Sequence, residues 1–199
     1  NHPALQGRLS DSFIYVDPRD NNIAVGDVVG HGTVLAELAA GGAVGQWPGG
    51  IAPGATLVSA RIIADKAPTD DGSGQGNEID GPLGLEAVHA DLIRAGTRIM
   101  NNSWGGLYWT DPNVTNPVAQ EYRAFVIDND GLVVFASGNE SRTEPSDTAA
   151  LPSQLGPNGT RPAADLERGW LVVGAVDTAN PTQLASYSNA CGVTMRYCL

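Results

Sequence analysis

The sequence is poor in positive charge and in long apolar runs, and each shortage excludes a class of protein. Only 11 of its 199 residues are Lys or Arg, against 22 that are Asp or Glu, which gives a formal net charge of −11. A surface of this sign repels nucleic-acid phosphate, so we expect no nucleic-acid partner. No apolar run approaches the ~20 residues that cross a bilayer, and residues 1–4 lack the features of a signal peptide. We therefore expect no membrane contact from this segment.

Cysteine is also scarce. The chain has only Cys191 and Cys198, close together near its end. They are either a local disulfide that closes a short loop or two reduced thiols. We favour the disulfide, because two close cysteines in an otherwise cysteine-free chain are typical of a clamped loop in an oxidising compartment. This reasoning favours a secreted protein over a cytoplasmic one.

Length and periodicity predict one α/β domain. With 42% hydrophobic residues, 199 residues are enough for a single sizeable core. Short apolar runs predict buried parallel strands at 56–63, 97–100, 132–136 and 171–176, and apolar residues at helical spacing predict helices at 84–95 and 117–129. This alternation predicts an α/β fold with a largely parallel sheet flanked by helices, in one domain spanning 1–199. Loops rich in Gly and Pro, at 67–81 and 140–161, are long enough to suggest function.

His31 is the first candidate catalytic residue. It lies between Gly30 and Gly32 at the predicted start of a helix of small residues, where glycines allow a substrate to approach the ring closely. The alternative is a capping or core histidine. His2, at the terminus, and His89, inside a helical stretch without glycine neighbours, are interpreted as structural.

Asn139 is the second candidate. It follows the apolar run 132–136 and a turn opened by Gly138, at the carboxyl edge of the predicted sheet, where α/β folds bind their ligands. A carboxamide at this edge can donate a hydrogen bond to an oxyanion. The alternative is an Asn that serves only to form the turn.

Three segments, in this order and at this spacing, resemble the subtilisin-like serine proteases. They are Gly-His-Gly-Thr at 30–33, Asn-Asn-Ser-Trp-Gly-Gly at 101–106 and Phe-Ala-Ser-Gly-Asn-Glu at 135–140. Further matching segments cover nearly the whole chain, including 51–55, 173–177 and 185–189. The resemblance implies a three-layer fold and a serine endopeptidase that cleaves extended polypeptides by a Ser-His-Asp mechanism. It assigns the catalytic base to His31 and an oxyanion donor to Asn139.

The resemblance also implies a substrate groove that pairs with an extended peptide through backbone hydrogen bonds. The residues implied in substrate binding are Ser103, Trp104 and Gly105 on one edge, Gly72, Ser73 and Gly74 on the facing edge, and Ala136, Ser137 and Gly138 in the wall of the primary pocket. Trp104 stands where the family commonly has an aliphatic residue, so the neighbouring subsite departs from the family pattern.

The Asp and Ser motifs of the family's triad do not occur in these 199 residues. Residues 1–8 resemble the stretch that follows the family's Asp, and 188–199 resemble a cysteine-bounded loop ahead of the Ser in proteases exported as bacterial autotransporter passengers. We therefore expect a fragment incomplete at both ends, inactive by itself, from a protein secreted or held at a bacterial cell surface. Apolar surface that the whole domain would bury predicts association with the remainder of the parent chain or self-association.

The sequence leaves one alternative function open and excludes another. A non-catalytic peptide-binding or structural module that retains the groove stays open as the alternative function. A nucleotide-binding domain is excluded, because no Gly-x-Gly-x-x-Gly joins a strand to a helix and no P-loop occurs. We expect no cofactor and no metal, since the acidic residues of loop 67–81 do not have the spacing of a calcium loop.

Overall fold

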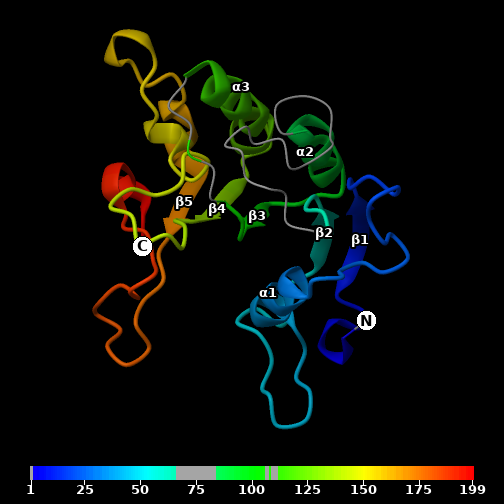
Figure 1. Ribbon diagram of the computed structural model, residues 1–199. Coiled ribbons are helices and arrows are strands. Elements are labelled where there is room, and N and C mark those ends of the chain that lie inside the picture. The colour runs from blue at the N-terminus through cyan, green and yellow to red at the C-terminus, as the bar shows by residue number, and fades with distance from the viewer. Residues whose placement is uncertain (1, 66–83, 106–107, 109–111) are drawn as a thin grey trace. The chain divides into compact units, whose positions relative to one another are not determined.

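The computed structural model describes residues 2–65, 84–105, 108 and 112–199 (Figure 1). The chain divides into two compact units, Asn1–Asp80 and Gly81–Leu199. The single domain expected over the whole chain stays a prediction. Among the described residues, no helix has both the length and the apolar character needed to cross a membrane. Within the same residues, His, Cys, Asp and Glu side chains form no group of three or more that could hold a metal ion.

The first unit contains a pair of parallel strands and one α-helix. Strand β1 (Leu9–Ile14) pairs in parallel with β2 (Leu57–Arg61), and helix α1 (His31–Ala40) lies between them in the chain. A short 3-10 helix, η1 (Pro3–Leu5), contacts α1. Parallel strands need a crossover connection, and α1 with its flanking loops forms it. Val34 and Leu38 of α1 are more than half exposed, so this unit leaves part of its apolar surface uncovered.

The second unit is built on a three-stranded parallel sheet. Its strand order is β3 (Ile99–Asn102), β4 (Leu132–Ala136) and β5 (Trp170–Val173). Helix α2 (Leu85–Arg94) contacts helix α3 (Pro112–Arg123), which continues into the π-helical turn η3 (Ala124–Asp128). The other short helical turns are η4 (Leu151–Ser153), η5 (Pro157–Gly159), η6 (Ala164–Gly169) and η7 (Gly192–Tyr197).

Aromatic rings make the core of the second unit. Tyr122 and Phe135 are fully buried with their ring centroids 5.9 Å apart, and Trp170 lies 4.9 Å from Tyr122 and 5.4 Å from Phe135. His89 is also buried in this core, 4.6 Å from the Tyr122 ring, and its Nδ1 lies 2.7 Å from the Glu121 carbonyl oxygen. Burial lowers the pKa of His89, so this histidine is held neutral inside the core.

The predicted α/β class, with parallel sheets flanked by helices, is confirmed. Strand β4 has the predicted bounds, and β2 and α2 lie within the predicted ranges. Strands β3 and β5 overlap their predicted ranges in part, at 99–100 and 171–173. Strand β1 was not predicted, because its sequence, LSDSFI, is half polar and gives no continuous apolar run. The predicted start of a helix at Pro117 was wrong: α3 begins at Pro112 and contains Pro117.

Candidate active site

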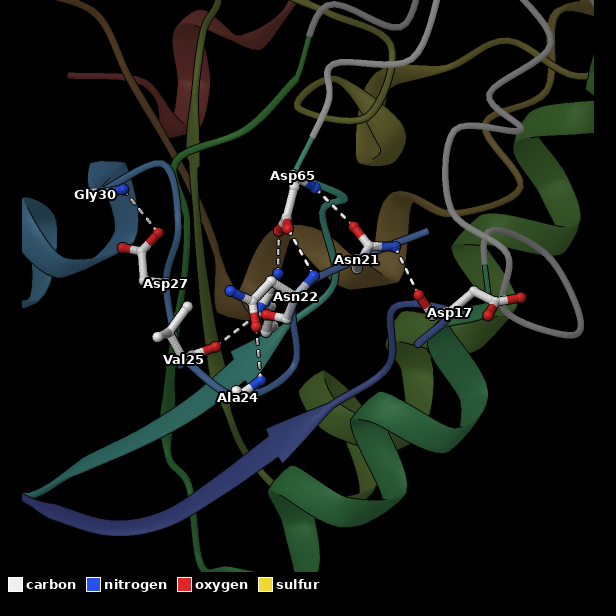
Figure 2. Close-up of polar contacts among 9 residues, drawn as sticks. Asp17, Asn21, Asn22, Ala24, Val25, Asp27, Gly30 and Asp65 are labelled. Carbon is white, nitrogen blue, oxygen red and sulfur yellow. Dashed lines mark hydrogen bonds and ion pairs between the residues drawn. The ribbon is translucent and has the colours of Figure 1, made fainter. Parts of the chain in front are cut away.

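His31 is the first residue of α1 and is exposed. The preceding residue, Gly30, has a φ of +87° in the left-handed region that favours glycine, and it has no side chain with which to cap the helix. The carboxylate of Asp27 replaces that cap. It accepts hydrogen bonds from the Gly30 N–H (2.8 Å), the Thr33 N–H (2.8 Å) and the Thr33 hydroxyl (2.7 Å); Figure 2 shows Asp27 facing Gly30. The first turn that carries His31 is therefore fixed from four residues upstream.

These hydrogen bonds also favour the ionised form of the Asp27 carboxyl group. Partial burial acts to raise the pKa of its carboxyl group, but the donors of Thr33, Gly30 and Val29 outweigh it and hold the pKa below its ordinary value. Asp27 is therefore ionised at neutral pH, and its negative charge lies at the positive end of the α1 dipole.

The loop ahead of Asp27 is held by Arg61, at the end of β2. The Arg61 side chain is only 8% exposed. Its Nη1 donates to the carbonyls of Asn22 (2.9 Å) and Val25 (2.7 Å), and its Nη2 is paired with Asp65. Asp65 in turn accepts from the Asn22 N–H and donates its own N–H to Asn21 Oδ1, as Figure 2 shows. One buried guanidinium thus orders the loop between β1 and α1.

Asn139 lies in the turn that follows β4 in the second unit. Gly138 has a φ of +120°, and a Cβ added to it would lie 2.2 Å from the Nδ2 of Asn189, so only glycine fits. Asn139 itself is exposed. Within the described residues, its carboxamide makes no hydrogen bond, and only its backbone N–H is engaged. A free carboxamide at this edge is available to a ligand.

The segment Ser103–Gly105 directly follows β3. Trp104 is fixed by its neighbours: its Nε1 donates to Asn102 Oδ1 (3.0 Å) and its ring lies 5.3 Å from the ring of Phe135 on β4. In the part of the chain that the structure describes, the backbone N–H and C=O groups of 103–105 have no hydrogen-bond partner. Unpaired backbone groups beside a strand end can be satisfied by an extended peptide.

Ser137 differs from the other predicted substrate contacts because it is buried and all its polar groups are used internally. Its N–H donates to the Val173 carbonyl, its carbonyl accepts from the Ser146 N–H, and its hydroxyl donates to the Asn189 carbonyl. Ala136 ends β4 and is paired with Val173 of β5. The predicted contacts Gly72, Ser73 and Gly74, like the acidic residues of loop 67–81, lie outside the described residues.

Cys191 and Cys198 form a disulfide whose Cα atoms are 5.8 Å apart. The bridge encloses η7, and the hydroxyl of Tyr197 inside the loop lies 2.6 Å from Ser153 Oγ. Beyond Cys198, the backbone of Leu199 exchanges hydrogen bonds with Val172 and Gly174. The disulfide therefore clamps a loop that is tied to β5 and to the 151–153 turn.

A polar cluster that the sequence did not point to surrounds the Asn139 turn. Tyr108, Glu140 and Asn189 are mutually hydrogen-bonded, and the Arg142 guanidinium lies 3.7 Å above the Tyr108 ring. Burial and the neighbouring Glu140 raise the pKa of Tyr108 to about 12. Burial acts to raise the pKa of Glu140 too, but the hydrogen bonds from Tyr108, Asn189 and Asn139 hold it below its ordinary value. Asn189 lies in the matched segment 185–189, which was the only signal for it in the sequence.

The sequence model described as "Subtilase family" matches residues 1–199. The chain belongs to the subtilase family. This confirms the resemblance to subtilisin-like proteases, while the relation to autotransporter passengers stays a prediction. "Serotype-specific antigen 1" of Mannheimia haemolytica is 32% identical over 113 residues, which are 50% of this chain and 11% of that protein.

Solved structures show the same fold. The epidermin leader peptide processing serine protease EpiP of Staphylococcus aureus has a TM-score of 0.61 and 18% identity over 95% of this chain and 46% of its own. The prenylagaramide maturation protease PagA has a TM-score of 0.58 and 18% identity over 100% of this chain and 57% of its own. The chain therefore spans about half the length of these subtilases.

Proposed function

We propose that this chain carries the His base, the oxyanion Asn and part of the substrate-binding surface of a serine endopeptidase that hydrolyses peptide bonds of extended polypeptides. The observation that supports this most is the Asn139 turn of a subtilase-family chain, which follows a parallel strand and presents a carboxamide that has no hydrogen bond to the described residues. The backbone groups of 103–105, which have no hydrogen-bond partner among the described residues, add a surface with which an extended peptide can pair.

In the proposed Ser-His-Asp mechanism, His31 takes the proton of a serine hydroxyl as the serine attacks the scissile carbonyl, and then gives that proton to the leaving amine. The Asn139 carboxamide donates a hydrogen bond to the oxyanion of the tetrahedral intermediate. The serine and the aspartate of the triad are proposed to come from parts of the protein outside these 199 residues.

The test is covalent labelling of the full-length protein with a serine-directed organophosphorus reagent, followed by assay of casein cleavage. We expect labelling and cleavage in the wild type. His31→Ala is expected to lower kcat about 10⁶-fold, as loss of the base does in Ser-His-Asp sites. His2→Ala is the matched control, since among the described residues the polar contacts of the His2 side chain are with Glu37 and the Ala4 N–H. A wild type that binds peptides without labelling or cleavage would instead support the non-catalytic module.

We also propose that the protein is secreted or displayed at a bacterial cell surface. The Cys191–Cys198 disulfide and the relative whose name calls it an antigen support this location. Fractionation of the source cells, with an antibody against this chain, tests it: recovery only from the cytosol would contradict the proposal.

A further proposal concerns association. Ile51 is 95% exposed, and Val34 and Leu38 of α1 are more than half exposed, so the first unit has apolar surface to bury. We propose that the remainder of the parent chain, or a second copy, covers it. Light scattering of the 199-residue chain tests this, and a stable monomer at high concentration would contradict it.

A further inference from the structure

We propose that Asn189 is a positioning residue for Asn139, the proposed oxyanion donor: its buried side chain fixes the backbone on both sides of Asn139. This role rests on the proposed endopeptidase function. It gives a function to a fully buried residue that lies 50 positions beyond the turn in the sequence.

The first support is the hydrogen bonding between Asn189 and the turn. The Oδ1 of Asn189 accepts from the backbone N–H groups of Glu140 (3.0 Å) and Arg142 (2.9 Å). Its Nδ2 donates to the Ser137 carbonyl (3.2 Å), and its own N–H donates to the Gly138 carbonyl (3.0 Å). The Asn189 side chain therefore holds Ser137 before Asn139 and Glu140 after it, and the Asn189 backbone holds Gly138.

The burial of Asn189 makes this arrangement rigid. The residue has no exposed surface, so its amide cannot exchange these partners for water. Gly138 lets the amide come close, because any Cβ at position 138 would overlap the Asn189 Nδ2. A buried amide with satisfied hydrogen bonds has a single orientation, and it imposes that orientation on the turn.

The second support is a link from Asn189 to the N–H of Asn139 itself. The Oε2 of Glu140 accepts from the Asn139 N–H (2.9 Å), the Tyr108 hydroxyl (2.5 Å) and the Asn189 Nδ2 (2.9 Å). The Asn189 Nδ2 also donates to the Tyr108 oxygen (2.7 Å). Two side-chain donors, from Tyr108 and Asn189, thus hold the carboxylate in place, and the carboxylate holds the backbone of Asn139.

The consequence concerns orientation in the transition state. Within the described residues the Asn139 carboxamide has no hydrogen bond of its own, so its direction depends on the backbone that carries it. An oxyanion donor acts best when it is aimed before the charge develops, and a shift of about 1 Å can cost about 10²-fold in rate. Asn189 therefore fixes the direction of the Asn139 carboxamide before the oxyanion forms.

The test is a double-mutant cycle in the full-length protein, with Asn139→Ala, Asn189→Ala and both together. Steady-state kinetics use an internally quenched peptide that the wild type cleaves. We expect Asn139→Ala to lower kcat about 10²- to 10³-fold and Asn189→Ala about 10²-fold. In the Asn139→Ala background, Asn189→Ala should cost no further kcat, because it acts through the missing carboxamide. KM should change less than about twofold, as for an interaction made only in the transition state.

Thr194→Val is the matched control. Thr194 is also fully buried in the second unit, and its hydroxyl donates to the Cys191 carbonyl (2.6 Å), so this variant removes a buried hydrogen bond away from the turn. We expect it to lower thermal stability with kcat unchanged. Losses of kcat from Asn139→Ala and Asn189→Ala that multiply in the double variant would overturn the positioning role, as would a folded Asn189→Ala protein with the wild-type kcat.

Tyr108→Phe decides the question if Asn189→Ala does not fold. It removes one oxygen from a half-buried side chain and breaks the bonds to Glu140 and Asn189. We expect kcat to fall about 5- to 10-fold, the worth of roughly one hydrogen bond, with the loss again absent in the Asn139→Ala background. No loss, or a loss that persists in that background, overturns the role. A wild type that cleaves nothing, or an Asn139→Ala variant with full activity, instead refutes the proposed function on which the role rests.

Discussion

The carboxylate of Asp27 accepts hydrogen bonds from both the backbone N–H and the hydroxyl of Thr33. Because Gly30 cannot cap α1 with a side chain, these bonds satisfy first-turn donors that would otherwise need water. We predict that Asp27→Asn destabilises the protein by about 1–2 kcal/mol at neutral pH, similar to the loss of a helix cap. Urea unfolding of the wild type and the variant measures the difference.

The hydrogen bonds between Asp27 and Thr33 also predict that the stability of the protein depends on pH. The pKa of Asp27 is lower in the folded protein than its ordinary value of 3.8, so the folded state favours the ionised carboxyl group. Its stabilisation is fully present above pH ~4, where the carboxyl is ionised even in the unfolded chain, and it is lost as the pH falls through the lower folded-state pKa. The stability gap between wild type and Asp27→Asn should therefore shrink below pH ~4. A gap for Asp27→Asn that does not change with pH would contradict the prediction.

Gly138 should tolerate no side chain. Gly138→Ala combines a φ of +120° with a Cβ placed 2.2 Å from the Asn189 Nδ2 and 2.6 Å from the Glu140 Oε2. We predict a loss of about 1–3 kcal/mol from backbone strain alone, with an added steric cost and disruption of the Asn139 turn. Gly159→Ala is the matched control, because Gly159 also has a positive φ (+70°) but nothing within 4 Å of its Cβ position. Equal losses of stability in thermal unfolding would show that the contact with Asn189 has no effect.

Removal of the disulfide should destabilise the second unit. Cys191 and Cys198 are separated by seven positions, and closing a loop of that size is worth about 2–3 kcal/mol in the chain-entropy estimate. We predict that Cys191→Ser combined with Cys198→Ser lowers the free energy of unfolding by this amount, and that a reducing agent has the same effect on the wild type alone. If the reducing agent lowers the stability of the wild type and of the double variant equally, the disulfide is not the cause of that loss.

The sequence predicted the elements of this fold better than the contacts of the site. Continuous apolar runs identify strands buried on both faces, which is why β4 was predicted with its bounds and why the half-polar β1 was missed. The helix predicted at 117–129 rested on the helical spacing of Val118, Tyr122, Phe125 and Val126, so its start was placed five residues after the observed start of α3 at Pro112.

For the site, local motifs identified His31 and Asn139 as candidates, because glycines beside a polar residue are visible in the sequence. The residues that hold His31 and Asn139 in place could not be identified from the sequence. Asn189 acts on a turn about 50 positions away, and Arg61 holds a loop from the far end of β2; both depend on tertiary pairing, for which a single sequence has no periodic signal. The role of Asp27 could have been predicted from the sequence, since an acidic residue four positions before a helix start is a recognisable helix-end signal.

The backbone of 103–105, which is unpaired within the part of the chain that the structure describes, gives the last prediction, which separates substrate binding from catalysis. If an extended peptide pairs with this segment, the N–H of Gly105 is available to it, and proline at this position removes that N–H. In the full-length protein, Gly105→Pro should raise KM about 10-fold, the worth of one hydrogen bond to a peptide, with kcat nearly unchanged because the bond is made equally in the ground and transition states.

Gly105→Ala keeps the N–H and adds the same Cβ, which would lie 3.2 Å from Ser146 Oγ. It should change KM by no more than about twofold, as most substitutions at exposed positions do. Thermal unfolding of both variants identifies any change that comes from altered folding. A KM that rises equally in the two variants would assign the effect to the contact with Ser146, and an unchanged KM in Gly105→Pro would mean that substrates do not pair with this N–H.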